Sequence, residues 1–211
     1  MDSDEAASII LEIRDYYGLT KEDAPAYHGM GPYQVLVATI LSQQTTERSG
    51  TRATEALLSE YPGPEEMYSA DPGKVLEKIA GCRFCRQKAA AIMGCTRIIM
   101  EEYGGKVPDD PDALLAMPMV GSKTMSCVMR YGFGRPCVIV DTHIARVSRR
   151  LGLSDGRDAD HVQQDLTDLV PQELWDVMDG ALIFLGRDLC KPGAPQCEKC
   201  PVNTKCRFFT E

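Results

Sequence analysis

Apolar residues recur at helical spacing along nearly the whole chain. Ile9, Ile10, Ile13 and Tyr17 form one such face, and Gly18 directly after them is a typical helix end. Only residues 137–140 (CVIV) have the pattern of a strand. This segment is short, and no second strand is predicted with which it could pair. The sequence therefore predicts an all-α fold class, with further helices around residues 35–42, 53–58, 75–79, 90–98, 108–117, 162–169 and 174–185.

Length and composition fit one large domain or two small ones with a proper core. The chain has 211 residues, of which 44% are hydrophobic and 26% charged. Its longest apolar runs are far below the ~20 residues that span a bilayer, and its acidic start lacks the features of a signal peptide. We therefore expect a cytosolic protein with no membrane partner. Thiols stay reduced there, so the nine cysteines favour metal sites or buried thiols over disulfides.

The charge balance leaves the partner open. The net charge of −8 argues mildly against nucleic acid, because phosphate contacts need basic surface. Basic residues nevertheless cluster at 146–150 and recur through the C-terminal tail, so one face can be basic while the whole is acidic.

Four cysteines lie close together near the C-terminus. Cys190, Cys197, Cys200 and Cys206 have the spacing Cys-x6-Cys-x2-Cys-x5-Cys. Four thiolates can ligate zinc or an iron–sulfur cluster. Only the middle two form the tight pair typical of zinc, and the wider loops suit a bulkier four-iron group. Zinc and incidental cysteines are the alternatives.

A second group of candidate residues surrounds the segment MPMVGSKT. The pattern predicts a helix, a tight turn and a helix that starts near Ser122, so that Gly121 opens a helix N-terminus that can bind phosphate. Lys123 lies in the first turn, where the helix dipole disfavours its ammonium form. It is a candidate nucleophile, with an ordinary solvated lysine as the alternative.

Asp141 follows the apolar CVIV and precedes a helical pattern. It is most simply an N-cap residue, and it can also act as an electrostatic partner if a cleft brings it opposite Lys123. His143, next to it, is expected to be a structural hydrogen-bonding residue.

Together these motifs resemble the endonuclease III family of base-excision DNA glycosylases, from about residue 25 to the C-terminus. The segment MPMVGSKT resembles the hairpin L-P-G-V-G-x-K-T, and VDTHIARV matches V-D-T-H-hydrophobic-x-R-V. The segment LSQQTTE resembles L-S-x-Q-T-(S/T)-D, and the cysteine spacing is the one that holds the family's [4Fe-4S] cluster. The order and separation of the four elements also agree.

The resemblance implies two helical lobes with DNA in the cleft between them. Residues 25–135 are expected to form a six-helix bundle with a helix-hairpin-helix. Residues 1–24 and 136–211 are expected to combine the N-terminal helix with the iron–sulfur cluster lobe. The implied cofactor is a [4Fe-4S] cluster whose ligands are Cys190, Cys197, Cys200 and Cys206.

The implied activity is that of a DNA glycosylase with apurinic-site (AP) lyase activity, acting as a monomer on double-stranded DNA with damaged or mismatched bases. It removes oxidised pyrimidines by Schiff-base attack of Lys123 and β-elimination, with Asp141 essential for catalysis. Gln44 fills the gap opposite an extruded base, and Phe84 stands where the family places an apolar wedge. Further DNA contacts are expected from Met119, Gly121, Ser122 and Lys191.

Departures from the family pattern surround the region that reads the substrate. Met119 replaces the hairpin glycine, and Cys82 and Cys85, which lack two nearby ligands for a metal, are interpreted as free thiols. Two alternatives therefore remain: a monofunctional glycosylase specific for G·T or G·U mismatches, and a damaged-DNA binding protein without catalysis.

Overall fold

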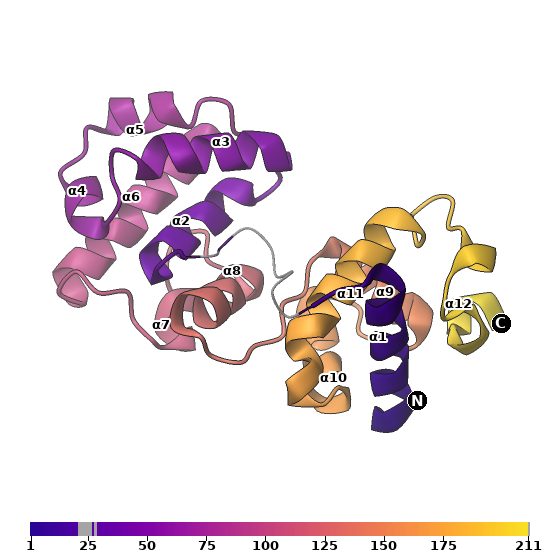
Figure 1. The fold of residues 1–211 in the computed structure, drawn as a ribbon. Coiled ribbons are helices and arrows are strands. Elements are labelled where there is room, and N and C mark those ends of the chain that lie inside the picture. Colours follow the sequence, from indigo (N-terminus) through magenta and orange to yellow (C-terminus); the bar gives the residue numbers. More distant parts are fainter. Residues whose placement is uncertain (21–26, 28, 211) are drawn as a thin grey trace. The chain divides into compact units, whose positions relative to one another are not determined.

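A computed structural model describes residues 1–20, 27 and 29–210. Helices make up 66% of the structure, and the described part of the chain contains no strand (Figure 1). The strand-like residues 137–140 are not in a strand, because no neighbouring strand is available to pair with them. Val138 and Val140 are instead buried in a helical core. The all-α prediction is confirmed.

The chain divides into two units, and each is described by itself. The terminal unit comprises Met1–Ala26 and Pro136–Glu211, and the central unit comprises Tyr27–Arg135. The predicted boundary between residues 24 and 25 lies outside the described residues. In the described ranges, no helix is both long enough and apolar enough to span a membrane.

The central unit is built around α2 (Pro32–Ser42). Nearly every side chain of α2 is buried, as its almost continuous apolar sequence requires. It contacts α3 (Glu47–Leu58), α6 (Cys85–Glu102), α8 (Ser122–Cys127) and a π-helical turn, Val128–Gly132. The short helices α4 (Pro64–Tyr68), α5 (Pro72–Lys78) and α7 (Pro111–Leu115) complete the unit, and each begins with proline at its first position.

The π-helical turn approaches the start of α2 so closely that it requires glycine. A Cβ atom added to Gly132 would lie 2.7 Å from the Cα atom of Pro32, which is shorter than any real contact of this kind. This close approach places α8, which leads directly into the turn, against α2.

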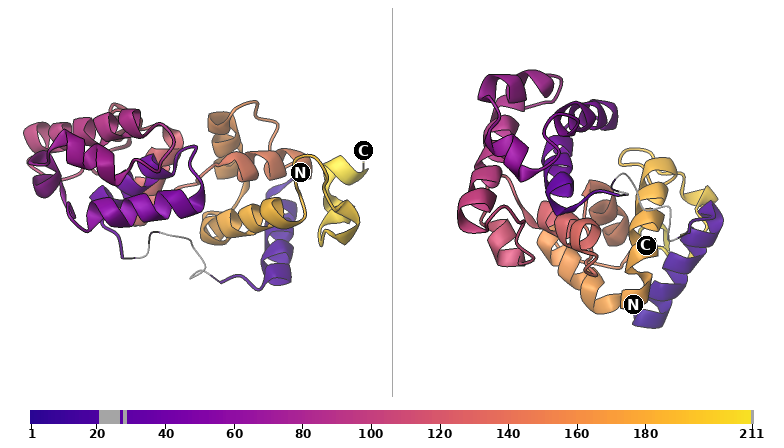
Figure 2. Two further views of the ribbon diagram at one scale, coloured as in Figure 1. Left: turned by 90° about the horizontal axis from the view of Figure 1, so that it is seen from above. Right: turned by 60° about the vertical axis from the view of Figure 1, so that its left-hand side comes forward.

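The terminal unit places α11 (Trp175–Asp188) against both α1 (Ser3–Tyr17) and α9 (Thr142–Leu151). Figure 2 shows α1, in indigo, beside the orange α11 from two further directions. Helix α10 (Ala159–Leu169) contacts α9, and the short α12 (Arg207–Thr210) follows the cysteines. Gly18 ends α1 in the left-handed conformation with φ 63°, as the sequence predicts.

The helices predicted from apolar spacing are all present. Asp2, Asp71, Asp110, Asp141 and Asp158 each cap a helix by accepting a hydrogen bond from a backbone N–H of the first turn. Helices α4 and α12 and the π-helical turn are not predicted, because each is too short to show a repeating apolar face.

Candidate functional site

Lys123 is the second residue of α8, directly after a tight turn. The turn closes through hydrogen bonds from Met117 N to Leu114 O (3.0 Å) and from Val120 N to Met117 O (3.2 Å). Gly121 precedes the helix in an extended conformation, with no side-chain cap. Lys123 is half-buried. The predicted helix, tight turn and helix starting at Ser122 are therefore present.

Met119 adopts a backbone conformation that favours glycine. Its φ is 58°, and its side chain is 37% exposed at the tip of the turn. An L-residue with a side chain is strained in this region. The turn therefore keeps the left-handed geometry that a glycine at this position would allow, even though the residue is methionine.

The loop after α2 is joined to this turn by a side chain that the motif comparison did not single out. The Gln43 amide nitrogen donates to Met119 O at 3.0 Å and to Thr124 Oγ1 at 3.2 Å. The neighbouring Gln44 is exposed, and its φ is 48°. The LSQQTTE motif assigns Gln44 to the DNA side but leaves the position of Gln43 unspecified, so the inward contact of Gln43 was not predicted.

An open hollow of about 650 Å³ lies over the turn. Lys123 lines it from α8, and the loop contributes Gln43. The remaining lining residues belong to the hairpin: Met119, Val120, Gly121 and Thr124. The central unit thus gathers an amine, a primary amide and backbone groups around one solvent-accessible space. Gln44 and Phe84 do not line this hollow.

Phe84 lies in a separate exposed turn at the start of α6. Its side chain is 42% exposed, its φ is 58°, and the guanidinium carbon of Arg83 lies 4.8 Å from its ring centroid. Gln44, Phe84 and Met119 are the described non-glycine residues with positive φ. Strained backbone of this kind is concentrated at functional sites, and here it falls on residues that the sequence predicts to contact DNA. Cys82 and Cys85, which flank Phe84, form no disulfide.

Asp141 belongs to the terminal unit and is the N-cap residue of α9. Its Oδ1 accepts a hydrogen bond from Ile144 N at 2.8 Å, and the residue is half-buried. The predicted cap is confirmed. Lys123 belongs to the central unit, so each of the two side chains is described within its own unit.

His143 has the structural role that the sequence predicts. Its Nδ1 lies 3.3 Å from a guanidinium nitrogen of Arg146. Arg146 also donates to Gly186 O at 2.8 Å and to Cys190 O at 3.1 Å. Arg146, the arginine of the VDTHIARV motif, was given no role from the sequence; it connects the helix capped by Asp141 to the end of α11 and the first cysteine of the tail.

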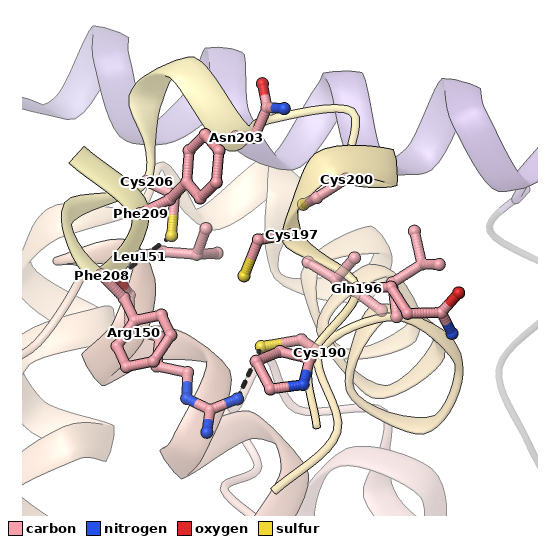
Figure 3. A pocket seen from close by; sticks show the side chains of 13 residues that line it. Arg150, Leu151, Cys190, Gln196, Cys197, Cys200, Asn203, Cys206, Phe208 and Phe209 are labelled. Atoms are coloured by element: carbon pink, nitrogen blue, oxygen red, sulfur yellow. Dashed lines mark hydrogen bonds between the residues drawn. The ribbon is translucent and has the colours of Figure 1, made fainter. Parts of the chain in front are cut away.

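The four tail cysteines line one pocket of about 350 Å³ (Figure 3). Burial raises the pKa of the Cys200 thiol to about 11, with a smaller contribution from electrostatic repulsion by the other three cysteines. Burial also raises the pKa of Cys206. Among the described residues, no three His, Cys, Asp or Glu side chains are close enough to hold a metal ion together. Four thiols that line one pocket match the donor set of a four-iron cluster.

Arg150 fixes the loop that carries the first of these cysteines. It donates to Cys190 Sγ at 3.4 Å, to Lys191 O at 2.8 Å and to Pro192 O at 2.9 Å. Its guanidinium carbon also lies 4.7 Å from the centroid of the Phe208 ring, which lines the same pocket. The side chain of Lys191 itself is exposed. No motif pointed to Arg150, because its partners are about forty positions away in sequence.

The chain is similar to known DNA-repair proteins over most of its length. Residues 37–172 match the family model described as "HhH-GPD superfamily base excision DNA repair protein". The chain is 38% identical over 178 residues to the endonuclease III of Thermotoga maritima, covering 84% of each chain. It is also 38% identical to that of Bacillus subtilis, covering 83% of this chain and 81% of the relative. A solved trapped endonuclease III–DNA covalent intermediate, an estranged-adenine complex, matches with a TM-score of 0.88 and 30% identity, covering 100% of this chain and 98% of the other.

Proposed function

Since the chain belongs to the HhH-GPD superfamily of base excision DNA repair proteins, we propose that it removes damaged bases from duplex DNA with Lys123 as nucleophile. As a homologue of the endonuclease III proteins, it is a DNA glycosylase and AP lyase. The observation that carries the residue assignment is the position of Lys123, which lines the open hollow beside the hairpin and Gln43. A related endonuclease III has been trapped as a covalent intermediate with DNA, which is consistent with an amine nucleophile.

In the proposed reaction, the neutral amine of Lys123 attacks C1′ of the deoxyribose. The bond between C1′ and the base breaks, and the base leaves with its electron pair and takes up a proton. Opening of the sugar ring gives an imine between Nζ and C1′. The imine acidifies the hydrogen on C2′, and its removal expels the 3′ phosphate, so that β-elimination cuts the strand.

The carboxylate of Asp141 assists this reaction. Its negative charge stabilises the positive charge that develops on the sugar, or takes the proton from Lys123. The cap hydrogen bond from Ile144 N engages Oδ1 and leaves Oδ2 for the reaction.

The reacting base must leave the helical stack, and exposed residues of the central unit support this step. Phe84, exposed on its strained turn, is the proposed wedge that unstacks the base pair. Gln44 is the proposed residue that fills the gap opposite the extruded base. The proposed phosphate contacts come from the backbone N–H groups of Gly121 and Ser122, from Met119 at the tip of the turn and from the exposed side chain of Lys191.

The terminal unit is proposed to hold a [4Fe-4S] cluster through Cys190, Cys197, Cys200 and Cys206. The shared pocket, the four thiols and the hydrogen bond from Arg150 to Cys190 Sγ support this assignment. When bound, the cluster supplies structural order to the tail, and thereby to Lys191. The protein is proposed to act as a monomer in the prokaryotic cytosol, where thiols stay reduced.

The proposed substrates are oxidised pyrimidines, and duplex oligonucleotides test this directly. Duplexes that carry thymine glycol, uracil, a G·T mismatch or an abasic site are incubated with the purified protein, and strand cleavage is measured with and without alkali. Cleavage of the thymine glycol duplex without alkali is expected. Base loss that becomes visible only after alkali would instead identify a monofunctional glycosylase, and no reaction on any duplex would contradict the proposal.

A further inference from the structure

A lysine is fully buried beneath the loop that carries Gln44. Lys88 lies in the first turns of α6, and its side chain is 0% exposed. Charged side chains are almost never fully buried unless a partner compensates for the lost hydration. Burial lowers the pKa of Lys88, because the loss of hydration disfavours its charged ammonium form. None of the roles described above uses this residue.

The partners of Lys88 are three oxygens of neutral groups. Its Nζ donates to Leu41 O, Gln43 O and Thr45 Oγ1, each at 2.6 Å. An ammonium group has three donors and no acceptor, so these contacts match its full hydrogen-bonding capacity. Leu41 and Gln43 are at the end of α2, where carbonyl groups lack helical partners and carry the negative end of the dipole.

These contacts hold the residues on both sides of Gln44, one through its carbonyl group and the other through its hydroxyl group. Gln43 O and Thr45 Oγ1 flank Gln44 along the chain, and both are bound by the same ammonium group. Gln44 itself has φ 48°, a strained conformation that persists only where its surroundings fix it. From the other side, the Gln43 side chain ties the loop to Met119 O. The main chain is thus fixed while the Gln44 side chain stays exposed.

We propose that Lys88 is a positioning residue that holds Gln44 in its left-handed conformation and so presents its side chain to the DNA strand opposite the lesion. The inference rests on the proposed function, in which Gln44 fills the gap left by the extruded base. Without the ammonium group, the loop relaxes to negative φ and the Gln44 side chain turns to a new direction. Lys88 then acts through Gln44 and does not touch DNA.

The test compares two forms of one abasic substrate. Single-turnover cleavage is measured on an abasic strand in a duplex and on the same strand alone, which has no opposite base for Gln44 to meet. Lys88→Met keeps the apolar length of the side chain and removes its donors. We expect its duplex rate to fall about tenfold or more, the scale set by lost charge-assisted hydrogen bonds, while its single-strand rate stays within about twofold of that of the wild type.

Two further variants make the comparison specific. Lys106→Met makes the same chemical change at an exposed lysine and is expected to match the wild type on both substrates. Gln44→Ala is expected to reproduce the duplex defect of Lys88→Met. The double variant Gln44→Ala/Lys88→Met is expected to be no slower than either single variant, because both changes act through one side chain.

Equal loss on duplex and single strand would overturn the proposal and assign Lys88 to the stability of the whole unit. Unchanged duplex cleavage would overturn it as well.

If Lys88→Met does not fold, Thr45→Val carries the test, because it removes one acceptor and keeps the shape of the side chain. We expect Thr45→Val to lose about threefold on the duplex alone, and wild-type rates would overturn the proposal. Failure of the wild type on both substrates would instead mean that the proposed function is wrong.

Discussion

The Gln43 side-chain amide donates to the main-chain oxygen of Met119 at 3.0 Å, and so joins the loop after α2 to the hairpin turn before α8. The same nitrogen lies 3.2 Å from Thr124 Oγ1, one position beyond Lys123. These hydrogen bonds hold two segments about eighty positions apart in sequence in a fixed position relative to each other. The proposed nucleophile and the loop that carries Gln44 are positioned together.

Gln43→Ala is expected to uncouple these two segments. It removes two hydrogen bonds, each of which contributes about 0.5–1.5 kcal/mol. We expect the free energy of unfolding to fall by about 1–2 kcal/mol, measured by urea denaturation. Cleavage of an abasic duplex is expected to fall by about tenfold, since small displacements of reacting groups are costly. Unchanged cleavage with reduced stability would show that the connection has no role in positioning.

Met119→Gly is expected to raise stability, unlike most glycine substitutions. Relief of the strain at φ 58° is worth about 1–2 kcal/mol, against about 0.4–1 kcal/mol of added chain entropy in the unfolded state. Leu115→Gly is a matched control, because Leu115 is similarly exposed but lies in α7. Thermal denaturation should show a higher Tm for Met119→Gly and a lower one for Leu115→Gly. A lower Tm for both would contradict the strain at Met119.

Substitutions of Asp141 separate its cap from its charge. Asparagine caps helices about as well as aspartate, so Asp141→Asn should keep wild-type stability, while Asp141→Ala should lose about 1 kcal/mol. Both should lose the carboxylate and therefore about a hundredfold or more of the base-excision rate. Activity in Asp141→Asn close to that of the wild type would show that the cap alone accounts for this residue.

Arg150→Met is expected to weaken cofactor binding. Arg150 fixes the loop of Cys190 through hydrogen bonds to Cys190 Sγ, Lys191 O and Pro192 O. Its neighbour Arg149 makes comparable bonds to Gly156 O and Arg157 O, away from the pocket, so Arg149→Met is the control.

Elemental analysis of the purified proteins measures this effect. We expect about four iron atoms per chain in the wild type and in Arg149→Met, and a lower iron content, with weaker visible absorbance, in Arg150→Met. Zinc in place of iron would contradict the cluster assignment, and full iron content in Arg150→Met would contradict the role of this arginine.

The helical parts of the fold could be predicted from the sequence because their causes are local. Apolar spacing defines the faces of α1, α10 and α11, and aspartates with Gly18 mark helix ends. The cysteine spacing likewise predicts one shared pocket. The positive φ at Met119 agrees with the glycine that the endonuclease III family has at this position of the hairpin.

Other features depend on contacts between distant residues, which periodicity does not reveal. Lys88 has the sequence context of any helical lysine, and its burial follows only from the packing of α6 against α2. The inward turn of Gln43 and the roles of Arg146 and Arg150 are likewise set by carbonyl groups far along the chain. These residues become visible only when the elements are placed in space.

Borohydride trapping tests the central claim most directly. The wild type, Lys123→Gln and Lys106→Met are each incubated with thymine glycol and abasic duplexes in the presence of borohydride, which reduces an imine to a stable protein–DNA adduct. We predict that the wild type and Lys106→Met form the adduct and that Lys123→Gln does not. An adduct that persists in Lys123→Gln would assign the nucleophile to another residue, and no adduct with any protein would contradict the imine mechanism itself.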